Sequence, residues 1–212
     1  MMQGPVADEF MHKQGKEIPE NMFDVIIIGG GLAGLTAAIL LSQENKKILL
    51  LEKKEYPFHK VCGEYISNEI LPFLKSVGFD PFVHDAARIH KLRISTPAGK
   101  NIYTPLDLGG FGLSRFVMDN ALHVVAKKKG AAIITGSKVT DVSFRDNYFD
   151  VETKDGVRYT SKLVIGSYGK RDTLDKKLDR GFIHKKTGYM GIKYHVKVPY
   201  PVDEVGLDNF AG

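Results

Sequence analysis

The sequence is poor in cysteine and in long apolar runs, and each absence narrows the class of protein. The 212-residue chain has one cysteine, Cys62, so no disulfide can form within it, which suits a reducing cytoplasm. No apolar run approaches the roughly 18 residues that a membrane-spanning helix needs. Residues 1–21 have mixed charge and lack the apolar core of a secretory signal. We therefore expect a flexible leader over residues 1–22 of a cytoplasmic protein.

The positive charge also lacks the pattern of a nucleic-acid site. The net charge is +5, but the lysine runs at 127–129, 176–177 and 185–186 are short, far apart and without interleaved aromatics. We expect solvated helix ends, no nucleic-acid partner, and at most a weak peripheral contact with an anionic membrane. The seven histidines have no ligand-type spacing, so the sequence predicts no metal site.

What the sequence does contain is the run VIIIGGGLAGLTAAILLSQENKKILLLE, from Val25 to Glu52. Residues 23–28 are short, apolar and β-branched, as in a central parallel strand. Residues 32–43 have a helical pattern, and 47–51 form a second apolar run. Because two such strands become parallel neighbours through a helical crossover, the run predicts a βαβ unit.

Three glycines follow the first predicted strand, in the spacing Gly29-x-Gly31-x-x-Gly34. Gly29 permits a tight turn, Gly31 leaves room for a pyrophosphate, and Gly34 allows close packing of helix on sheet. Free N–H groups at the helix start would bind the phosphates. Glu52 ends the second strand, where a carboxylate can accept ribose hydroxyls and disfavours a 2′-phosphate. The unit predicts a dinucleotide site, open between NAD and FAD, against the alternative of a glycine-rich turn without a ligand.

The remaining pattern predicts an α/β fold in which a parallel sheet is joined to a three-stranded antiparallel meander. Ser114 is the expected cap of a helix over 115–129 whose apolar stripe is Val117, Ala121, Val124 and Val125. The other expected elements are a helix over 67–76 that contains Pro72, strands at KLRIST and KNIYT near 88–105, a strand at 131–135, meander strands at 139–144, 148–153 and 157–165, and a strand region at 189–198.

Four segments together carry a resemblance to a known family. They are DVIIIGGGLAGLTAA with LLLEKK, HKVCGEYIS at 59–67, GLSRFVMDNAL at 112–122 and KLVIGSYGKRDTL at 162–174. In this order and spacing, the chain from Phe23 to Gly212 resembles the flavin-dependent family of geranylgeranyl reductases and p-hydroxybenzoate hydroxylase-like monooxygenases. The CGE sequence within the second segment points to the reductase-like branch.

The resemblance implies FAD as cofactor and a Rossmann-like FAD-binding domain over 23–180, with an inserted strand pair. Residues 181–212 would begin an α+β substrate domain that is truncated. Arg115 would reach the phosphate or ribityl region of FAD, and the backbone at Val139 would lie beside the adenine. The expected cofactor-binding residues are Gly29, Gly31, Ala33, Gly34, Glu52, Lys53, Arg115 and Val139.

The loop around Cys62 leaves two interpretations open. A thiol flanked by His59 and Lys60 could be reactive, and in geranylgeranyl reductase-like proteins this loop lies near the flavin and its cysteine is associated with the reaction. Cys62 is therefore the candidate catalytic residue. The alternative is a small buried cysteine in a tight loop.

The resemblance implies an FAD-dependent oxidoreductase that reduces a double bond of a small hydrophobic, isoprenoid-like substrate, with reduced nicotinamide, NAD(P)H, or another electron donor. A flavin monooxygenase acting on an aromatic or polyketide-like substrate is the first alternative. A non-catalytic, truncated FAD-binding fragment is the second. An NAD-dependent dehydrogenase fits less well, because the meander and the Arg115 segment do not belong to that plan.

Two departures from the family pattern limit these expectations. Tyr168 stands where relatives have an acid, and Asp172 where they have a serine. No Gly-Asp pair occurs in the sequence, although the family binds the ribityl chain through one. We therefore expect the chain to supply the adenosine and pyrophosphate part of the site, with a complementing C-terminal chain as a candidate partner.

Overall fold

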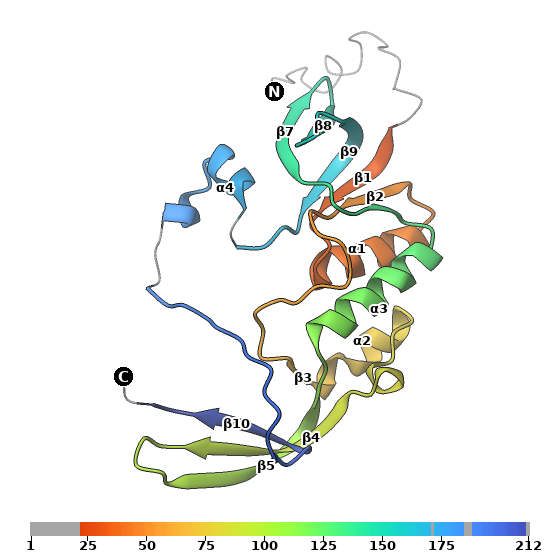
Figure 1. Ribbon diagram of the computed structural model, residues 1–212. Helices are drawn as coiled ribbons and strands as arrows, with labels where there is room; N and C mark the ends of the chain where they lie inside the picture. Colours follow the sequence, from red (N-terminus) through yellow and green to blue (C-terminus); the bar gives the residue numbers. More distant parts are fainter. Residues whose placement is uncertain (1–21, 171, 185–187, 211–212) are drawn as a thin grey trace, which may run out of the picture.

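The computed structural model describes residues 22–170, 172–184 and 188–210, so the expected leader lies outside them except for Met22. The described chain forms a six-stranded and a four-stranded sheet. Figure 1 shows the helices α1 and α3 between the two sheets, with a long segment returning from α4 to the last strand, β10. Among the described residues, no helix combines the length and the apolar character that a membrane span requires.

The predicted βαβ unit is present at the predicted place. β1 (Phe23–Ile28) and β2 (Ile48–Leu51) are parallel neighbours joined by α1 (Leu32–Gln43). All four residues of β2 are buried, as are the last four of β1, because both faces of this central pair are covered. The carboxyl ends of both strands therefore lie side by side, which places Gly29 next to Glu52.

The meander is confirmed, and it belongs to the same sheet as β1 and β2. The strand order is β6-β2-β1-β9-β8-β7. Ser161 in β9 pairs with both Phe149 in β8, antiparallel, and Phe23 in β1, parallel. β9 therefore joins the antiparallel meander to the parallel part of the sheet. The strands added here are β6 (Ala132–Ile134), β7 (Val139–Arg145), β8 (Tyr148–Thr153) and β9 (Arg158–Gly166).

Helix α3 (Arg115–Lys128) begins at the predicted cap, where the Ser114 hydroxyl accepts the Phe116 N–H at 3.2 Å. Three residues of the predicted stripe, Val117, Ala121 and Val125, are partly buried and pack against the core, whereas Val124 is exposed. The fully buried residues lie one position further along the helix and are Met118, Asp119, Leu122 and Ala126. Valines and alanines occur around the whole helix, so the apolar pattern alone does not determine which face is buried. Packing against α1 and the burial of the polar residue Asp119 determine it.

The four-stranded sheet has the order β10-β4-β5-β3. Its strands are β3 (Tyr65–Ser67), β4 (Ala87–Ser95), β5 (Asn101–Gly112) and β10 (Glu204–Asp208). The helix predicted over 67–76 is a 3-10 turn η1 (Asn68–Ile70) followed by α2 (Leu71–Ser76), with Pro72 in the first turn, where it costs no hydrogen bond. The remaining short elements are η2 (Pro81–His84), α4 (Thr173–Lys177) and η3 (Gly181–His184).

The predicted strand at 189–198 was wrong. The structure assigns no strand to these residues, and the strand of this region is β10, parallel to β4. The alternation of apolar and polar residues was read correctly, but a strand also needs a neighbouring edge, and the described residues offer none at this place. The domain boundaries proposed from the sequence stay predictions.

Candidate functional site

The three glycines after β1 are needed for three different reasons. Gly29 has φ +104°, and a Cβ there would lie 2.6 Å from the Ser167 carbonyl oxygen. A Cβ at Gly34 would lie 2.0 Å from the carbonyl oxygen of Gly29. A Cβ at Gly31 would meet only the Lys60 ammonium, at 3.1 Å. The first and third glycines are therefore required by the fold, whereas the second borders space that a ligand can occupy.

The start of α1 fits the phosphates of a dinucleotide. Gly31 is the N-cap residue, no side chain caps the helix, and its first turn carries no acid. Ala33 lies exposed in that turn. Because the first N–H groups of a helix have no partner within it and lie at the positive end of its dipole, this end favours an anion. The pyrophosphate of FAD fits this cradle.

Glu52 is buried and holds the glycine loop in place. One carboxylate oxygen accepts the Gly30 N–H at 2.6 Å, and the other accepts the Lys54 N–H at 3.0 Å. A carboxylate has about four acceptor sites, so two remain for ribose hydroxyls. The sequence predicts that Glu52 contacts the ribose hydroxyls, and this stays a prediction. Sequence reasoning did not predict that Glu52 also supports the glycine loop.

Tyr56 supports the same loop from the other side, and sequence reasoning missed it. Its hydroxyl donates to the Gly30 carbonyl, and its ring stacks on His123 with centroids 4.3 Å apart. Burial, followed by the charges of Glu52 and Asp119, raises the pKa of Tyr56, so the hydroxyl keeps its proton. No spacing rule in the sequence predicts this contact.

Several predicted cofactor residues line one small pocket at the end of the parallel strands. Gly29, Glu52, Lys53 and Val139 all border it, together with Tyr168 and Asp172. Lys53 also forms an ion pair with Asp172 at 3.2 Å. The structure thus brings together the residues assigned to the adenosine, from the end of β2 onward and from the start of β7, although their contact with a nucleotide stays a prediction.

The two residues that depart from the family pattern have partners of their own. The Tyr168 hydroxyl donates to Asp175 at 3.0 Å. Asp172 accepts the Leu174 N–H at 3.1 Å and so caps α4, whose Leu174 is buried against the sheet. Both residues therefore fix α4 beside the pocket.

A buried acid connects the glycine loop with the α3 segment. The carboxylate of Asp119, which has no exposed surface, accepts two hydrogen bonds from the Arg115 guanidinium, at 2.7 and 2.9 Å. Its outer oxygen lies 3.3 Å from the Lys60 ammonium, the cation nearest Gly31. Burial lowers the pKa of Arg115, but its hydrogen bonds to Asp119 outweigh that effect and raise the pKa.

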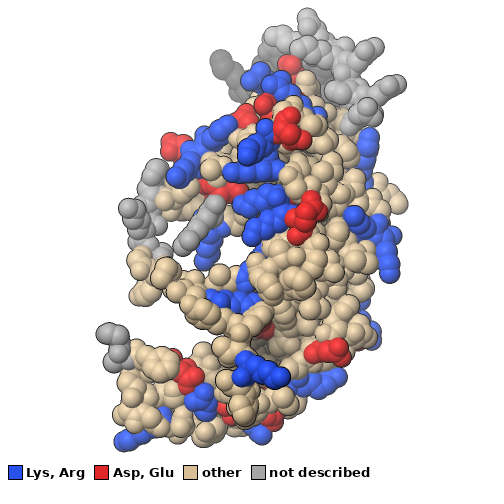
Figure 2. All heavy atoms as spheres, in the orientation of Figure 1, with Lys and Arg blue, Asp and Glu red and all other residues tan. Residues whose placement is uncertain are grey.

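This arrangement changes which cation we expect nearest the phosphates. The Arg115 guanidinium is turned back onto its own helix, so its predicted contact with FAD stays a prediction. Sequence reasoning did not assign Lys60 or Asp119 to the site. Asp119 stands four residues after Arg115, a spacing that pairs side chains on a helix and could have identified it. Figure 2 shows Lys and Arg side chains gathered around the hollow in the middle of this face.

Cys62 lies partly exposed in the loop that carries Lys60. Its sulfur accepts the Glu64 N–H at 3.5 Å. Glu64 has φ +60°, unusual for this residue type, and its carboxylate accepts the Arg115 N–H at 2.7 Å and pairs with Lys193. Burial opposes ionisation of Glu64, but the bonds from Lys193 and Arg115 prevail and lower its pKa. A catalytic role for Cys62 stays a prediction.

Comparison with known proteins agrees with this geometry. Residues 24–60 match the family model "FAD binding domain". The chain is 25% identical over 187 residues to menaquinone reductase of Mycobacterium tuberculosis, covering 85% of this chain and 46% of that protein. It is 30% identical over 169 residues to digeranylgeranylglycerophospholipid reductase 2 of Methanothermobacter thermautotrophicus, covering 76% and 43%.

The fold also matches solved structures. One is p-nitrophenol 4-monooxygenase PnpA of Pseudomonas putida, with a TM-score of 0.66 and 19% identity over 74% of this chain and 43% of that chain. The chain spans less than half the length of the relatives described here. Together with the glycine loop, these matches show that the chain is similar to FAD-dependent oxidoreductases, among them digeranylgeranylglycerophospholipid reductases, menaquinone reductases and FAD-dependent monooxygenases.

Proposed function

We propose that the chain holds the adenosine and pyrophosphate of FAD for the reduction of a double bond in a hydrophobic, isoprenoid-like substrate. The observation that carries the cofactor part is the combination of an uncapped helix start with the open space at Gly31. The substrate class is supported by relatives named for reduction of digeranylgeranylglycerophospholipid and menaquinone.

The residues around the loop have distinct proposed roles. The first N–H groups of α1 and the Lys60 ammonium neutralise the pyrophosphate. Glu52 accepts the ribose hydroxyls, and the backbone at Val139 borders the adenine. Asp119 keeps Lys60 and Arg115 at the loop while no phosphate is bound. FAD, when bound, supplies the two-electron chemistry, and reduced nicotinamide is the proposed electron donor.

Cys62 is the proposed reactive group of the chain. Its thiol is reachable from solvent, and its loop is fixed by the bonds of Glu64 to α3 and to Lys193. A substitution such as Cys62→Ala should therefore slow substrate reduction while leaving bound FAD in place.

A flavin monooxygenase is the second candidate, favoured by the FAD-dependent monooxygenases among the relatives. A third candidate, a non-catalytic FAD-binding fragment, is favoured by the short span of the chain relative to those relatives.

Measurement of NAD(P)H oxidation by the FAD-loaded protein distinguishes the three candidate functions. Reduction of menaquinone or a geranylgeranyl lipid without oxygen supports the reductase, and oxygen consumption coupled to hydroxylation of an added aromatic substrate supports the monooxygenase. Stable FAD without either reaction supports the fragment.

A further inference from the structure

The segment that leads into β10 has the pattern of a β-strand but no strand partner among the residues that the structure describes. Every second residue is apolar over 13 positions. These side chains are between 43% and 83% exposed, although apolar residues in this alternation normally cover a core. They are Met190, Ile192, Tyr194, Val196, Val198, Tyr200 and Val202.

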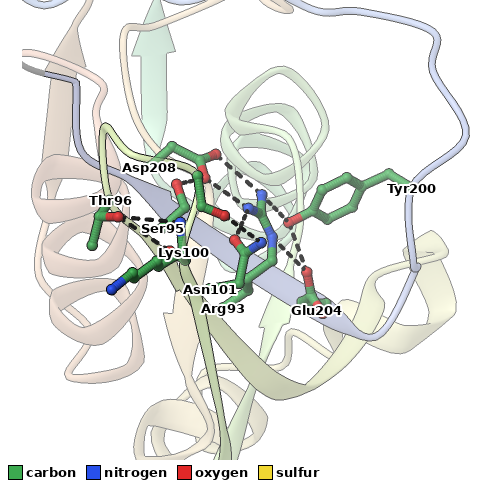
Figure 3. Close-up of polar contacts among 9 residues, drawn as sticks. Arg93, Ser95, Thr96, Lys100, Asn101, Tyr200, Glu204 and Asp208 are labelled. Carbon is green, nitrogen blue, oxygen red and sulfur yellow. Dashed lines mark hydrogen bonds and ion pairs between the residues drawn. The ribbon is translucent and has the colours of Figure 1, made fainter.

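The segment is nevertheless anchored at both ends. Near its start, Lys193 forms an ion pair with Glu64, and His195 lies 3.6 Å from the same carboxylate. At its end, Arg93 bonds Asp208 at 2.8 and 3.1 Å and Glu204 at 3.1 Å, which fixes β10 on β4. Figure 3 shows this cluster, with Tyr200 of the segment pointing into it. A partner would therefore meet a segment whose ends are already placed, which lowers the ordering cost of binding.

Only one edge of the segment can form a continuous ladder. In a strand, the N–H and C=O groups of alternate residues point to the same edge. The odd-numbered edge loses its donors at Pro199 and Pro201, because proline has no N–H. The even-numbered edge keeps every donor and acceptor from Met190 to Val198, and none of them is paired within the described residues.

The charge of the segment indicates the chemistry of its partner. Residues 188–202 contain two lysines and no carboxylate. Lys193 is neutralised by Glu64, whereas Lys197 has no acidic partner in the described part of the chain. A second copy of the chain that paired through this same segment would bring the same two lysines and no acid.

We propose that the even-numbered edge of residues 190–198 accepts a β-strand from a different polypeptide, one that is apolar on one face and carries carboxylates on the other. Main-chain hydrogen bonds would supply the affinity, and the pairing of Lys197 with an acid would supply the selectivity. This inference does not depend on FAD binding or on the reaction proposed above.

The test uses the full chain and a fluorescein-labelled strand peptide in which valine alternates with glutamate. Binding is followed by fluorescence anisotropy. Because Val196 lies on the even-numbered edge, Val196→Pro should bind the peptide at least about tenfold more weakly than Val196→Ala. Lys197 lies on the other edge, so Lys197→Pro should bind within about twofold of Lys197→Ala. Comparison with alanine at each position removes the effect of the lost side chain.

Each remaining outcome overturns the proposal. Failure of the wild-type chain to bind the glutamate peptide would do so, as would equal binding of a peptide that alternates valine with lysine. A dimer in light scattering that Val196→Pro dissolves would assign the edge to a second copy. Binding to vesicles of phosphatidylglycerol and phosphatidylcholine that neither proline variant weakens would assign the segment to a membrane surface. Circular dichroism confirms that each variant is folded.

Discussion

The glycine loop and the segment 188–202 differ in how their groups are satisfied. Around the loop, Gly30 is held through its N–H by Glu52 and through its carbonyl by Tyr56, and Gly34 packs directly on Gly29. In the segment, apolar side chains are exposed and the even-numbered backbone edge has no ladder. The groups of the loop are satisfied apart from the face that a ligand would occupy, whereas the described residues provide no partner strand for the segment. In each region, the polar or apolar groups that have no partner indicate the kind of molecule that the region binds.

The largest expected effect breaks the close packing of the loop. In Gly34→Ala the new methyl would lie 2.0 Å from a backbone oxygen that cannot move freely. Alanine gains about 1 kcal/mol of helix propensity over glycine, but we expect the clash to cost more, so that the free energy of unfolding falls by about 3 kcal/mol. Urea unfolding followed by circular dichroism measures the change.

Gly31→Ala is the matched control for this comparison. Its methyl would meet only the mobile Lys60 ammonium, so stability should change by about 1 kcal/mol or less. Its affinity for FAD should fall at least about tenfold, because the methyl lies where the pyrophosphate is expected. Equal loss of stability in the two variants would contradict the distinct roles assigned to these glycines.

Glu52→Gln tests the support of the loop. The amide keeps one acceptor oxygen but places a donor group against a backbone N–H, so one charged hydrogen bond is lost. We expect a loss of about 2 kcal/mol in stability and weaker FAD binding. The exposed neighbour Glu55→Gln provides the control, and a stability equal to that of Glu52→Gln would refute the role of Glu52.

Lys60→Met tests the open face of the same loop. Removal of the ammonium should weaken FAD binding about tenfold at low salt, and by less at high salt, where a surface charge is screened. Fluorescence titration of FAD at two salt concentrations measures the effect. Lys75→Met, on the exposed side of α2, should leave the affinity unchanged. An equal affinity of Lys60→Met and the wild type would remove Lys60 from the phosphate site.

The smallest expected effect concerns the contact behind the loop. Burial, and then the charge of Lys127, lowers the pKa of His123 below its usual 6.5, so the folded state favours the neutral ring. Its stabilising contribution is therefore present above pH 6.5 and is lost as the pH falls through the folded pKa. His123→Phe keeps the stack on Tyr56 and should reduce the difference in unfolding free energy between pH 7.5 and pH 5, which urea unfolding at the two pH values measures. An unchanged difference would contradict this prediction.

The same contrast explains which parts could be predicted from the sequence. The βαβ unit and the Ser114 cap follow from local patterns, and their contacts lie within a few residues or within adjacent strands. Tyr56 and Lys60 could not be assigned, because they meet the loop through the path of a connection that has no periodic pattern. Asp119 was missed although its helical spacing from Arg115 is a usable signal. The strand predicted at 189–198 was wrong for another reason, since alternation predicts the ability to pair but does not supply the pairing edge.

The most direct test of the central claim is the visible absorption spectrum of the purified chain after incubation with FAD and gel filtration. Retention of a band near about 450 nm by the wild type, and its loss in a folded Gly31→Ala variant, is the expected result. Absence of the band from a wild-type chain whose circular dichroism shows it to be folded would contradict the claim that this glycine loop binds FAD.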